Sequence, residues 1–256
     1  MILFHVFLIG EYMKRAKILV IEGTDGSGKE TQSKKLYDYL INNGYKVKRY
    51  SFPMYDTPTG KIVGGPYLGK GEISKSYFSE TSANVDPLVS SLYYAADRRY
   101  NFLNTIESEI YKNDIIILDR YITSNMGHQA SKAKTEKERE KILKFIETLE
   151  YDLCELPRPD NVIFLHMCFE ASKDLRKDRL YTDGNESNEN HLRNAENTYL
   201  SIAKKYNWHY INCLKTDNYN SIDDIKSVDE IHKDIVKVTL DLLNQETSEI
   251  KKMTKF

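Results

Sequence analysis

Residues 23–29, Gly-Thr-Asp-Gly-Ser-Gly-Lys, are the stretch that decides the fold of this chain. An apolar run at 18–21 precedes them, and a helical pattern begins at residue 30. Glycines allow several backbone N–H groups to turn inward toward one anion, and the N-terminus of the following helix adds its dipole. The order of strand, glycine-rich loop and helix therefore predicts a phosphate-binding loop. An ordinary glycine turn is the alternative.

The spacing G-x-x-x-x-G-K is complete, but the position after the lysine is unusual. Lys29 is expected to bring a point charge to the β- and γ-phosphates of a nucleotide. Glu30 stands where a Ser or Thr hydroxyl normally binds Mg²⁺. Thr31 follows, but it is rotated by about 100° around the helix and does not automatically replace that hydroxyl.

The charge of the chain is balanced, with 37 basic and 38 acidic residues and a formal net charge of −1. A general nucleic-acid-binding protein carries a basic excess, so we expect small anionic ligands and no nucleic-acid partner. Hydrophobic residues make up 40% of the chain, enough for the core of one domain. Cys154, Cys168 and Cys213 are widely spaced, which predicts neither a zinc site nor a disulfide framework and indicates a cytoplasmic protein.

Both ends of the chain are expected to lie outside the folded domain. Residues 1–12 are interpreted as an N-terminal extension or a mis-assigned start, with Met13 as the natural beginning. Their apolar part, 1–9, is too short to span a bilayer, and no membrane partner is expected. The domain itself is placed at 13–244, and 245–256 is expected to form a frayed C-terminal tail.

Strand and helix patterns alternate along the chain, which predicts an α/β fold with a parallel sheet. The expected strands are 16–22, 45–51, 115–118, 162–165 and 209–213. The expected helices are 30–43, 87–112, 122–131, 135–152, 189–206 and 227–243. The segments 52–71 and 170–188 are expected to be irregular.

The helix at 87–112 is expected to bury an apolar stripe and to present a polar pair on the opposite side. The stripe consists of Leu88, Leu92, Ala96, the stem of Arg99, Leu103, Ile106 and Ile110. Tyr94 and Arg98 lie one turn apart on the other side. An aromatic plane and a guanidinium on one face suit a planar, oxygen-bearing base, and a solvated Tyr–Arg stack is the alternative.

Polar residues follow the strand at 115–118, at the sheet edge where open parallel sheets bind ligands. Asp119 is placed to orient Mg²⁺, and Arg120 can hold a phosphate with two parallel hydrogen bonds. A purely structural Asp–Arg pair is the alternative. Asn125 and Gln129 lie one turn apart on the next helix, and both can donate and accept hydrogen bonds as a base edge requires.

The segment 170–188 is too polar to belong to the core. It contains Arg176, Arg179, Asp183 and Glu186. The two arginines can swing over a transferring phosphoryl group and stabilise its charge. Glu186 is assigned with Asp119 as a candidate Mg²⁺ ligand. A solvated charged loop is the alternative.

Five segments occur in an order and spacing that resemble the motifs of thymidylate kinases, a family of P-loop nucleoside monophosphate kinases. They are 22–29, Phe-Pro-x-Tyr at 52–55, Leu-Tyr-Tyr-Ala-Ala-Asp-Arg at 92–98, Asp-Arg-Tyr-x-x-Ser-Asn at 119–125, and Leu-Pro-Arg-Pro-Asp at 156–160. Any one motif is only moderately specific, whereas the ordered set is very specific. The resemblance extends from about residue 17 to residue 213.

The resemblance implies a three-layer P-loop fold, with a five-stranded parallel sheet, helices on both faces and a mobile lid at about 170–188. It implies transfer of the γ-phosphoryl group of ATP to thymidine monophosphate (dTMP). The products are thymidine diphosphate (dTDP) and ADP, and the reaction supplies dTTP for DNA synthesis. Mg²⁺ is the implied cofactor, small-molecule nucleotides are the implied partners, and a homodimer is the implied assembly.

The resemblance also assigns the donor side of the site. The residues expected around the phosphates of ATP are Gly23, Thr24, Asp25, Gly26, Ser27, Gly28, Lys29, Glu30 and Thr31. The residues expected to be catalytic are Lys29, Arg120, Arg176 and Arg179.

On the acceptor side, Asp25 resembles the carboxylate that binds the sugar 3′-hydroxyl, and Tyr94 the aromatic that stacks on thymine. Arg98 matches the arginine that contacts a base oxygen, and Arg120 the one that contacts the acceptor phosphate. His128 stands where a Tyr commonly screens against a ribose 2′-hydroxyl. The full set expected at dTMP is Asp25, Phe52, Tyr55, Tyr94, Arg98, Arg120, Asn125, His128 and Gln129.

The chain departs from the family pattern at four positions. Glu30 replaces the metal-binding hydroxyl, and His128 replaces the Tyr. Gly26 occupies a position where some members carry a catalytic Arg, which favours the arginines of the lid. Met54 stands where many members have a phosphate-binding Arg.

Three other functions remain as alternatives to a dTMP kinase. A nucleoside or nucleotide kinase of the same fold with a different acceptor is the nearest. A nucleotide-binding switch protein would carry a guanine-recognising N-K-x-D segment, which the sequence lacks. A pseudo-kinase that binds ATP without turnover is suggested only by Glu30.

Overall fold

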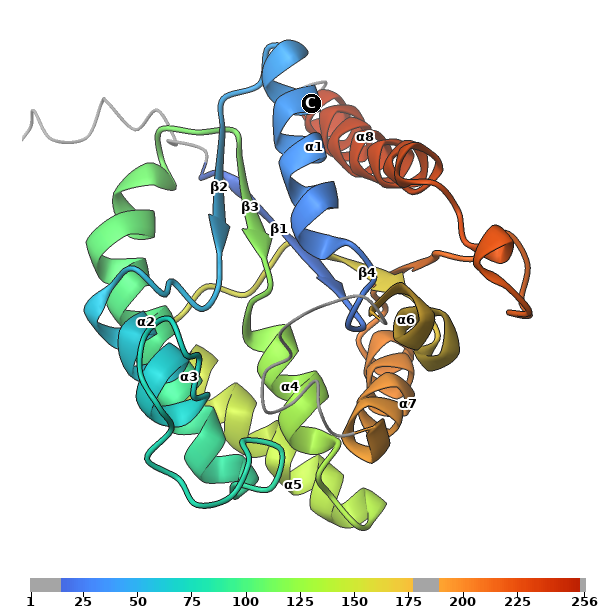
Figure 1. Ribbon diagram of the computed structural model, residues 1–256. Helices are drawn as coiled ribbons and strands as arrows, with labels where there is room; N and C mark the ends of the chain where they lie inside the picture. The colour runs from blue at the N-terminus through green and yellow to red at the C-terminus, as the bar shows by residue number, and fades with distance from the viewer. Residues whose placement is uncertain (1–14, 177–188, 254–256) are drawn as a thin grey trace, which may run out of the picture.

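The computed structural model describes residues 15–176 and 189–253, with side chains at 15–175 and 189–244 (Figure 1). Its centre is an all-parallel sheet of five strands in the order β2-β3-β1-β4-β5. The strands are β1 Lys17–Gly23, β2 Val47–Ser51, β3 Ile115–Asp119, β4 Asn161–His166 and β5 His209–Asn212. The α/β fold with a five-stranded parallel sheet, predicted from the sequence, is confirmed.

Helices cover both faces of this sheet, because the central strands are apolar on both sides. Leu19 and Ile21 of β1 pack with Leu36 of α1 and Ile231 of α8. The neighbouring Ile18 and Val20 point to the other face. The helices on the first face are α1 Lys29–Asn42 and α8 Val228–Met253, and those on the second include α4 Ile122–Ala130, α5 Glu136–Glu147 and α7 Glu189–Lys205 (Figure 1).

Two segments that were expected to be irregular contain helix. Within 52–71, α2 spans Pro58–Ile62 and a π-helical turn follows at Val63–Tyr67. Thr57 caps α2, because its side chain accepts a hydrogen bond from the backbone N–H of Gly60. α6 spans Phe169–Arg176, so the prediction of a loop at 170–188 is wrong for the first part of that segment. Residues 177–188 lie outside the described part of the chain.

The structure divides the helix expected at 87–112 into three successive segments. It begins as α3, Pro87–Asn101, with the side chain of Asp86 as its N-cap. A π-helical turn, Phe102–Ile106, and a 3₁₀ turn, Glu107–Glu109, continue it. The helix expected at 135–152 is likewise divided, because α5 gives way to a π-helical turn at Thr148–Leu153.

The sequence-based choice of the buried face of α3 is wrong. The expected buried residues Leu88, Leu92 and Leu103 are 39%, 51% and 46% exposed, although Ile106 and Ile110 are buried as expected. The buried side is the polar one, with Ser90, Ser91, Asp97, Arg98 and Asn101. Polar groups can be buried there because each finds hydrogen-bonding partners, so hydrophobicity alone selected the wrong side.

The chain ends differ in how far the structure describes them. Helix α8 continues to Met253, so the expected tail at 245–256 is helical over most of its length. The extension expected at 1–12 lies outside the described residues.

Candidate active site

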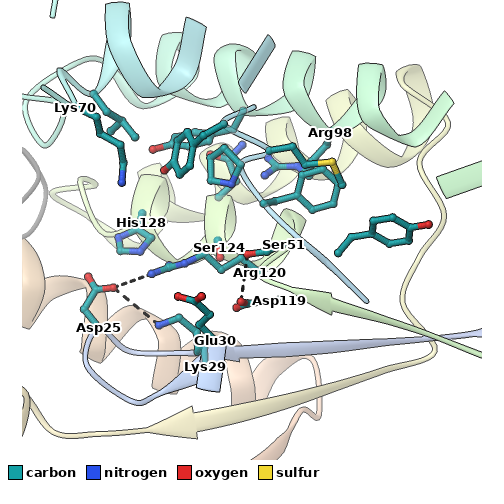
Figure 2. A pocket seen from close by; sticks show the side chains of 18 of the residues that line it. Asp25, Lys29, Glu30, Ser51, Lys70, Arg98, Asp119, Arg120, Ser124 and His128 are labelled. Atoms are coloured by element: carbon teal, nitrogen blue, oxygen red, sulfur yellow. Dashed lines mark hydrogen bonds and ion pairs between the residues drawn. The ribbon is translucent and has the colours of Figure 1, made fainter. Parts of the chain in front are cut away.

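A cavity of about 760 Å³ lies at the carboxyl edge of the sheet, where the ends of β1, β2 and β3 meet (Figure 2). Parallel strands bring the loops that follow them to one edge, so segments far apart in the sequence share this cavity. Its walls contain these residues predicted from the sequence: Asp25, Gly26, Gly28, Lys29, Glu30, Thr31, Phe52, Tyr55, Tyr94, Arg98, Asp119, Arg120, Asn125, His128 and Gln129.

The glycine-rich loop forms one wall of the cavity. Gly26 and Gly28 have φ angles of 81° and 80°, in the left-handed region that glycine adopts without a steric penalty. The Nζ of Lys29 donates hydrogen bonds to the carbonyls of Gly23 and Thr24, each at 2.8 Å. The lysine therefore lies back across its own loop, with its side chain 6% exposed.

Three residues expected around the phosphates support the loop from below and do not line the cavity. Gly23 is the last residue of β1, and Ser27 is buried. The hydroxyl of Thr24 donates to the carbonyl of Met167 and accepts from its N–H, at 2.7 and 2.9 Å. These bonds fasten the loop to the end of β4.

Asp25 joins the two basic residues of the site. Its Oδ1 lies 3.1 Å from Nη2 of Arg120 and 3.9 Å from Nζ of Lys29 (Figure 2). Burial opposes ionisation of Asp25, but the charges of Arg120 and Lys29 outweigh it and hold the pKa of the carboxyl well below its usual range. Burial lowers the pKa of the Lys29 amine to about 8, and the charge of Arg120 adds to this shift.

Arg120 adopts an unfavourable backbone conformation immediately after β3. Its φ angle is 65°, which is uncommon for a residue other than glycine. The backbone N–H of Arg120 donates to the carbonyl of Ile21 at 3.1 Å. This bond extends the backbone hydrogen bonding between β1 and β3 by one residue. Strained residues of this kind concentrate at functional sites, where the surrounding structure enforces them.

A second wall of the cavity comes from α3 and from the segment after β2. Tyr94 and Arg98 lie on one side of α3, with the guanidinium carbon 6.0 Å from the centre of the Tyr94 ring. Phe52 is buried and packs against Tyr121 with ring centroids 6.1 Å apart. Tyr55 carries Lys70 over its ring at 4.5 Å, and Lys70 also lines the cavity.

Helix α4 contributes three side chains to the same wall. Asn125 and Gln129 are 2% and 1% exposed. His128 stacks on His191 and meets Tyr199 edge-on, with ring centroids 5.7 and 5.6 Å apart. Burial lowers the pKa of His128 to about 3, so its imidazole is neutral at pH 7.

The oxygen donors near the glycine-rich loop fit a Mg²⁺ ion. Within residues 15–176 and 189–253, no three His, Cys, Asp or Glu side chains form a metal-binding group. Mg²⁺ does not require one, because it binds through one or two carboxylates, phosphate oxygens and water. Asp119 and Glu30 both bring carboxylates to the cavity. Asp119 also accepts hydrogen bonds from Arg49 and Ser51, at 2.9 and 3.1 Å.

Three of the predicted catalytic and metal-binding residues belong to the segment 170–188. Arg179 and Glu186 lie outside the described residues. Arg176 is the last residue of α6, and only its backbone is described.

The structure adds functional residues that the sequence reasoning missed. The carboxylate of Asp97 accepts from the N–H of Met54 and the hydroxyl of Thr59, and so fastens the segment after β2 to α3. Glu150 is 0% exposed and pairs with Arg98. A signal for Glu150 was present, because it follows the apolar Ile146 by four residues and extends the buried side of α5.

One cavity is lined by a glycine-rich loop with its lysine. The same cavity is also lined by an aromatic ring and two arginines. At the carboxyl edge of a parallel sheet, this combination defines the class of P-loop kinases that phosphorylate a small acceptor. The sequence model of the family Thymidylate kinase matches residues 21–235. The chain belongs to the thymidylate kinase family and is a nucleoside monophosphate kinase. The family, enzyme class and activity predicted from the motifs are confirmed, and membership supports ATP-dependent phosphorylation of dTMP to dTDP.

Individual relatives agree with this assignment. The chain is 28% identical to the thymidylate kinase of Prochlorococcus marinus subsp. pastoris, over 80% of this chain and 90% of that protein. It is also 28% identical to the thymidylate kinase of Schizosaccharomyces pombe, over 90% of this chain and 98% of that protein. The solved thymidylate kinase of Candida albicans has the same fold, with a TM-score of 0.61 at 22% identity, over 88% of this chain and 91% of that one.

Within residues 15–176 and 189–253, no helix is both long enough and apolar enough to cross a bilayer.

Proposed function

We propose that the cavity transfers the γ-phosphoryl group of ATP directly to the phosphate of dTMP, with the two nucleotides end to end along the sheet edge. The observation that carries this proposal is the single cavity shared by Lys29 and Arg98. The acceptor phosphate is already an anion near neutral pH, so no strong general base is needed. Catalysis then depends on positioning and on charge stabilisation in a closed site.

On the donor side, Lys29 and the amides of residues 23–29 bind the phosphates of ATP. The amine of Lys29 leaves the carbonyls of Gly23 and Thr24 for the β- and γ-phosphates as ATP binds. Asp119 and Glu30 are the residues that would hold Mg²⁺. When bound, that ion would neutralise negative charge on the transferring phosphoryl group.

On the acceptor side, Tyr94 stacks on the thymine ring and Arg98 donates to a base oxygen. Arg120 exchanges its bond with Asp25 for the acceptor phosphate, and the freed carboxylate of Asp25 accepts from the sugar 3′-hydroxyl. The neutral His128 limits the space beside the sugar. Phe52, Tyr55, Asn125 and Gln129 complete the pocket.

Arg176 and Arg179 serve as the lid arginines that stabilise the transferring group. Gly26 leaves the loop without a cation at the position where some family members carry Arg, and this supports a source in the lid. Substituting both arginines with alanine should lower kcat by at least about tenfold, since removing one positioned cation commonly has an effect of this size or larger. An unchanged kcat would move this role elsewhere.

One experiment separates the proposed reaction from its alternatives. ADP release is measured with Mg²⁺-ATP against a panel of deoxy- and ribonucleoside monophosphates. Preference for dTMP supports the proposal, and preference for another acceptor identifies a kinase of different specificity. ATP binding without turnover of any acceptor would identify a pseudo-kinase and refute the proposal.

The exposed apolar side of α3 supports a homodimer. Leu88, Val89 and Leu92 of α3 and Leu103 of the following π-helical turn are all more than a third exposed, and clustered exposed apolar residues mark interaction surfaces. A two-fold axis would bury the same side of α3 from both copies. Leu92→Glu should convert the dimer to a monomer in light scattering, whereas the matched control Ile222→Glu should not. A wild-type monomer at working concentration would refute the dimer.

A cytoplasmic location is the final part of the proposal. Cys154, Cys168 and Cys213 are free thiols in the structure, and dispersed free thiols suit a reducing compartment. Cell fractionation tests this directly, and recovery in an oxidising compartment would refute it.

A further inference from the structure

The buried carboxylate of Glu150 accepts hydrogen bonds from two residues of the cavity wall, Arg98 and Asn125. Glu150 lies in the π-helical turn Thr148–Leu153 and is 0% exposed. Its Oε2 accepts from Nε of Arg98 at 2.5 Å, and its Oε1 accepts from Nη2 of the same guanidinium at 2.6 Å. This two-pronged pair fixes the plane of the Arg98 guanidinium, because carboxylate and guanidinium match in geometry.

The same carboxylate also orients the amide of Asn125. Nδ2 of Asn125 donates to Oε1 of Glu150 at 2.9 Å and to the carbonyl of Ser91 at 3.3 Å. An ionised carboxylate and a backbone carbonyl can only accept hydrogen bonds, so both hydrogens of the amide are engaged and the amide cannot be reversed without loss.

This arrangement leaves Oδ1 of Asn125 as a buried acceptor atom at the cavity wall. Among the described residues, Oδ1 of Asn125 has no hydrogen-bonding partner, although the side chain is 2% exposed. A buried polar atom left in this way is costly unless a ligand satisfies it. Arg98 supplies the complementary group, because its bonds to Glu150 and to the carbonyl of Tyr121 use three of its five N–H donors.

We propose that Glu150 is the positioning residue that makes this pocket select a keto-pyrimidine over an amino-pyrimidine. The inference rests on the proposed function and names what sets its base specificity. A thymine or uracil edge offers a carbonyl oxygen to Arg98 and an N–H beside it to Oδ1 of Asn125. A cytosine edge offers an amino group and an unprotonated ring nitrogen at the same places. The amino group of cytosine would face the N–H donors of Arg98, and its ring nitrogen would face the acceptor Oδ1 of Asn125. Neither pair can form a hydrogen bond.

The test is the variant Glu150→Gln, which keeps the size of the side chain and adds a donor. A glutamine at this place can donate to Oδ1 of Asn125, so the amide of Asn125 can reverse. We expect kcat/KM for dTMP to fall at least tenfold through a higher KM, the preference for dTMP over dCMP to shrink by a similar factor, and the KM for ATP to remain unchanged. Sites built to bond a substrate N–H discriminate strongly, and this discrimination is what the variant removes.

A matched control comes from the same helical region. Glu147 faces Arg158 at 3.7 Å, away from Arg98. Glu147→Gln should therefore leave both KM values and the dTMP preference unchanged. Equal effects of the two substitutions, or a wild-type dTMP preference in Glu150→Gln, would overturn the proposal.

The wild-type protein gives a second measurement that does not depend on folding of a variant. N3-methyl-dTMP keeps both base oxygens and carries a methyl group in place of the ring N–H. The wild type should phosphorylate dTMP and dUMP but should use N3-methyl-dTMP and dCMP at least tenfold less efficiently. Efficient use of N3-methyl-dTMP would overturn the role of Asn125 and Glu150 while leaving the kinase assignment intact. Failure to phosphorylate any nucleotide would overturn the proposed function itself.

Discussion

Arg120 and Asp25 form an ion pair that joins the end of β3 to the glycine-rich loop, with Nη2 of Arg120 3.1 Å from Oδ1 of Asp25. The residue expected at the acceptor phosphate is thus bonded to a residue of the donor loop. Lys29 lies 3.9 Å from the same oxygen, so one carboxylate reduces the repulsion between two neighbouring cations. Asp25 therefore helps to hold both cations at the cavity wall.

Asp25→Asn should destabilise the protein near neutral pH, because it leaves two neighbouring cations without their shared carboxylate. We expect a loss of about 2 kcal/mol in the free energy of unfolding, since removing one partner of a largely buried pair is costly. The pKa of Asp25 is lower in the folded state than its ordinary value of 3.8. Its stabilisation is therefore present above pH 3.8 and is lost as the pH falls through the depressed value.

Urea unfolding of the wild type and Asp25→Asn across the acid range checks this. The difference between the two proteins should be constant from pH 7 to pH 5 and should shrink at lower pH. A difference that grows on acidification would contradict the assigned charge state.

Lys29 should make ATP binding sensitive to alkaline pH. Burial lowers its pKa to about 8, below the ordinary value of 10.5, so the free protein loses this charge as the pH rises through 8. Bound ATP favours the charged amine, and the KM for ATP should therefore be flat below pH 7 and should rise up to about tenfold per pH unit above 8. KM measurements at constant ionic strength test this.

Lys29→Met should show no such pH dependence and should reduce kcat at least about 100-fold, because a positioned cation is lost from the transferring group. The exposed Lys48 is a matched control, and Lys48→Ala should behave like the wild type. A KM for ATP in the wild type that does not change between pH 7 and 9 would disprove the lowered pKa.

Arg98→Ala should affect recognition of dTMP and stability by two separable routes. The KM for dTMP should rise far more than the KM for ATP. The protein should also lose about 3–5 kcal/mol of stability, because Glu150 becomes a buried charge without its partner. The double variant Arg98→Met with Glu150→Leu removes both charges and should recover most of the Tm without recovering the KM for dTMP.

Steady-state kinetics for both substrates, together with thermal unfolding, separate these two effects. Equal rises in the two KM values would contradict the role of Arg98 at the base. If the double variant were less stable than Arg98→Ala, the unpaired charge would not be the cause of the instability.

Gly26 and Gly44 offer a pair of substitutions that separates backbone strain from steric conflict. Both have positive φ angles, of 81° and 86°. A Cβ at Gly26 would lie 2.8 Å from Oγ of Ser172, whereas one at Gly44 would meet nothing within 4 Å. Gly44→Ala should cost about 1 kcal/mol through strain alone and leave activity unchanged. Gly26→Ala should cost more and should lower kcat/KM for ATP, because Ser172 or the loop must move. Equal activity losses in both variants would refute this distinction.

Local sequence was sufficient for the glycine-rich loop and for the positions of the five strands along the chain. The local pattern at 18–29 predicts a strand, a loop and the start of a helix. An apolar run, glycines and a helical period are signals that each extend over only a few residues. The polar residues after 115–118 could be placed at the same edge, because parallel strands end together. Those site residues do line one cavity.

The buried side of α3 shows where such reasoning fails. Hydrophobic periodicity favoured the side of Leu88 and Leu92, which is exposed, over the side of Arg98, which is buried. A polar side chain can be buried when the groups around it form hydrogen bonds with it. Those groups come from other parts of the chain. The partner of Arg98 is Glu150, 52 residues further along.

What the sequence determined by itself is therefore the anion-binding loop, the parallel sheet and the edge at which ligands meet, because these follow from short-range backbone preferences. Only the tertiary structure decided which polar side chains pair across the site: Asp25 with Arg120, and Glu150 with Arg98 and Asn125. Those pairings depend on three-dimensional proximity between helices and strand ends, and distance along the chain carries no information about it.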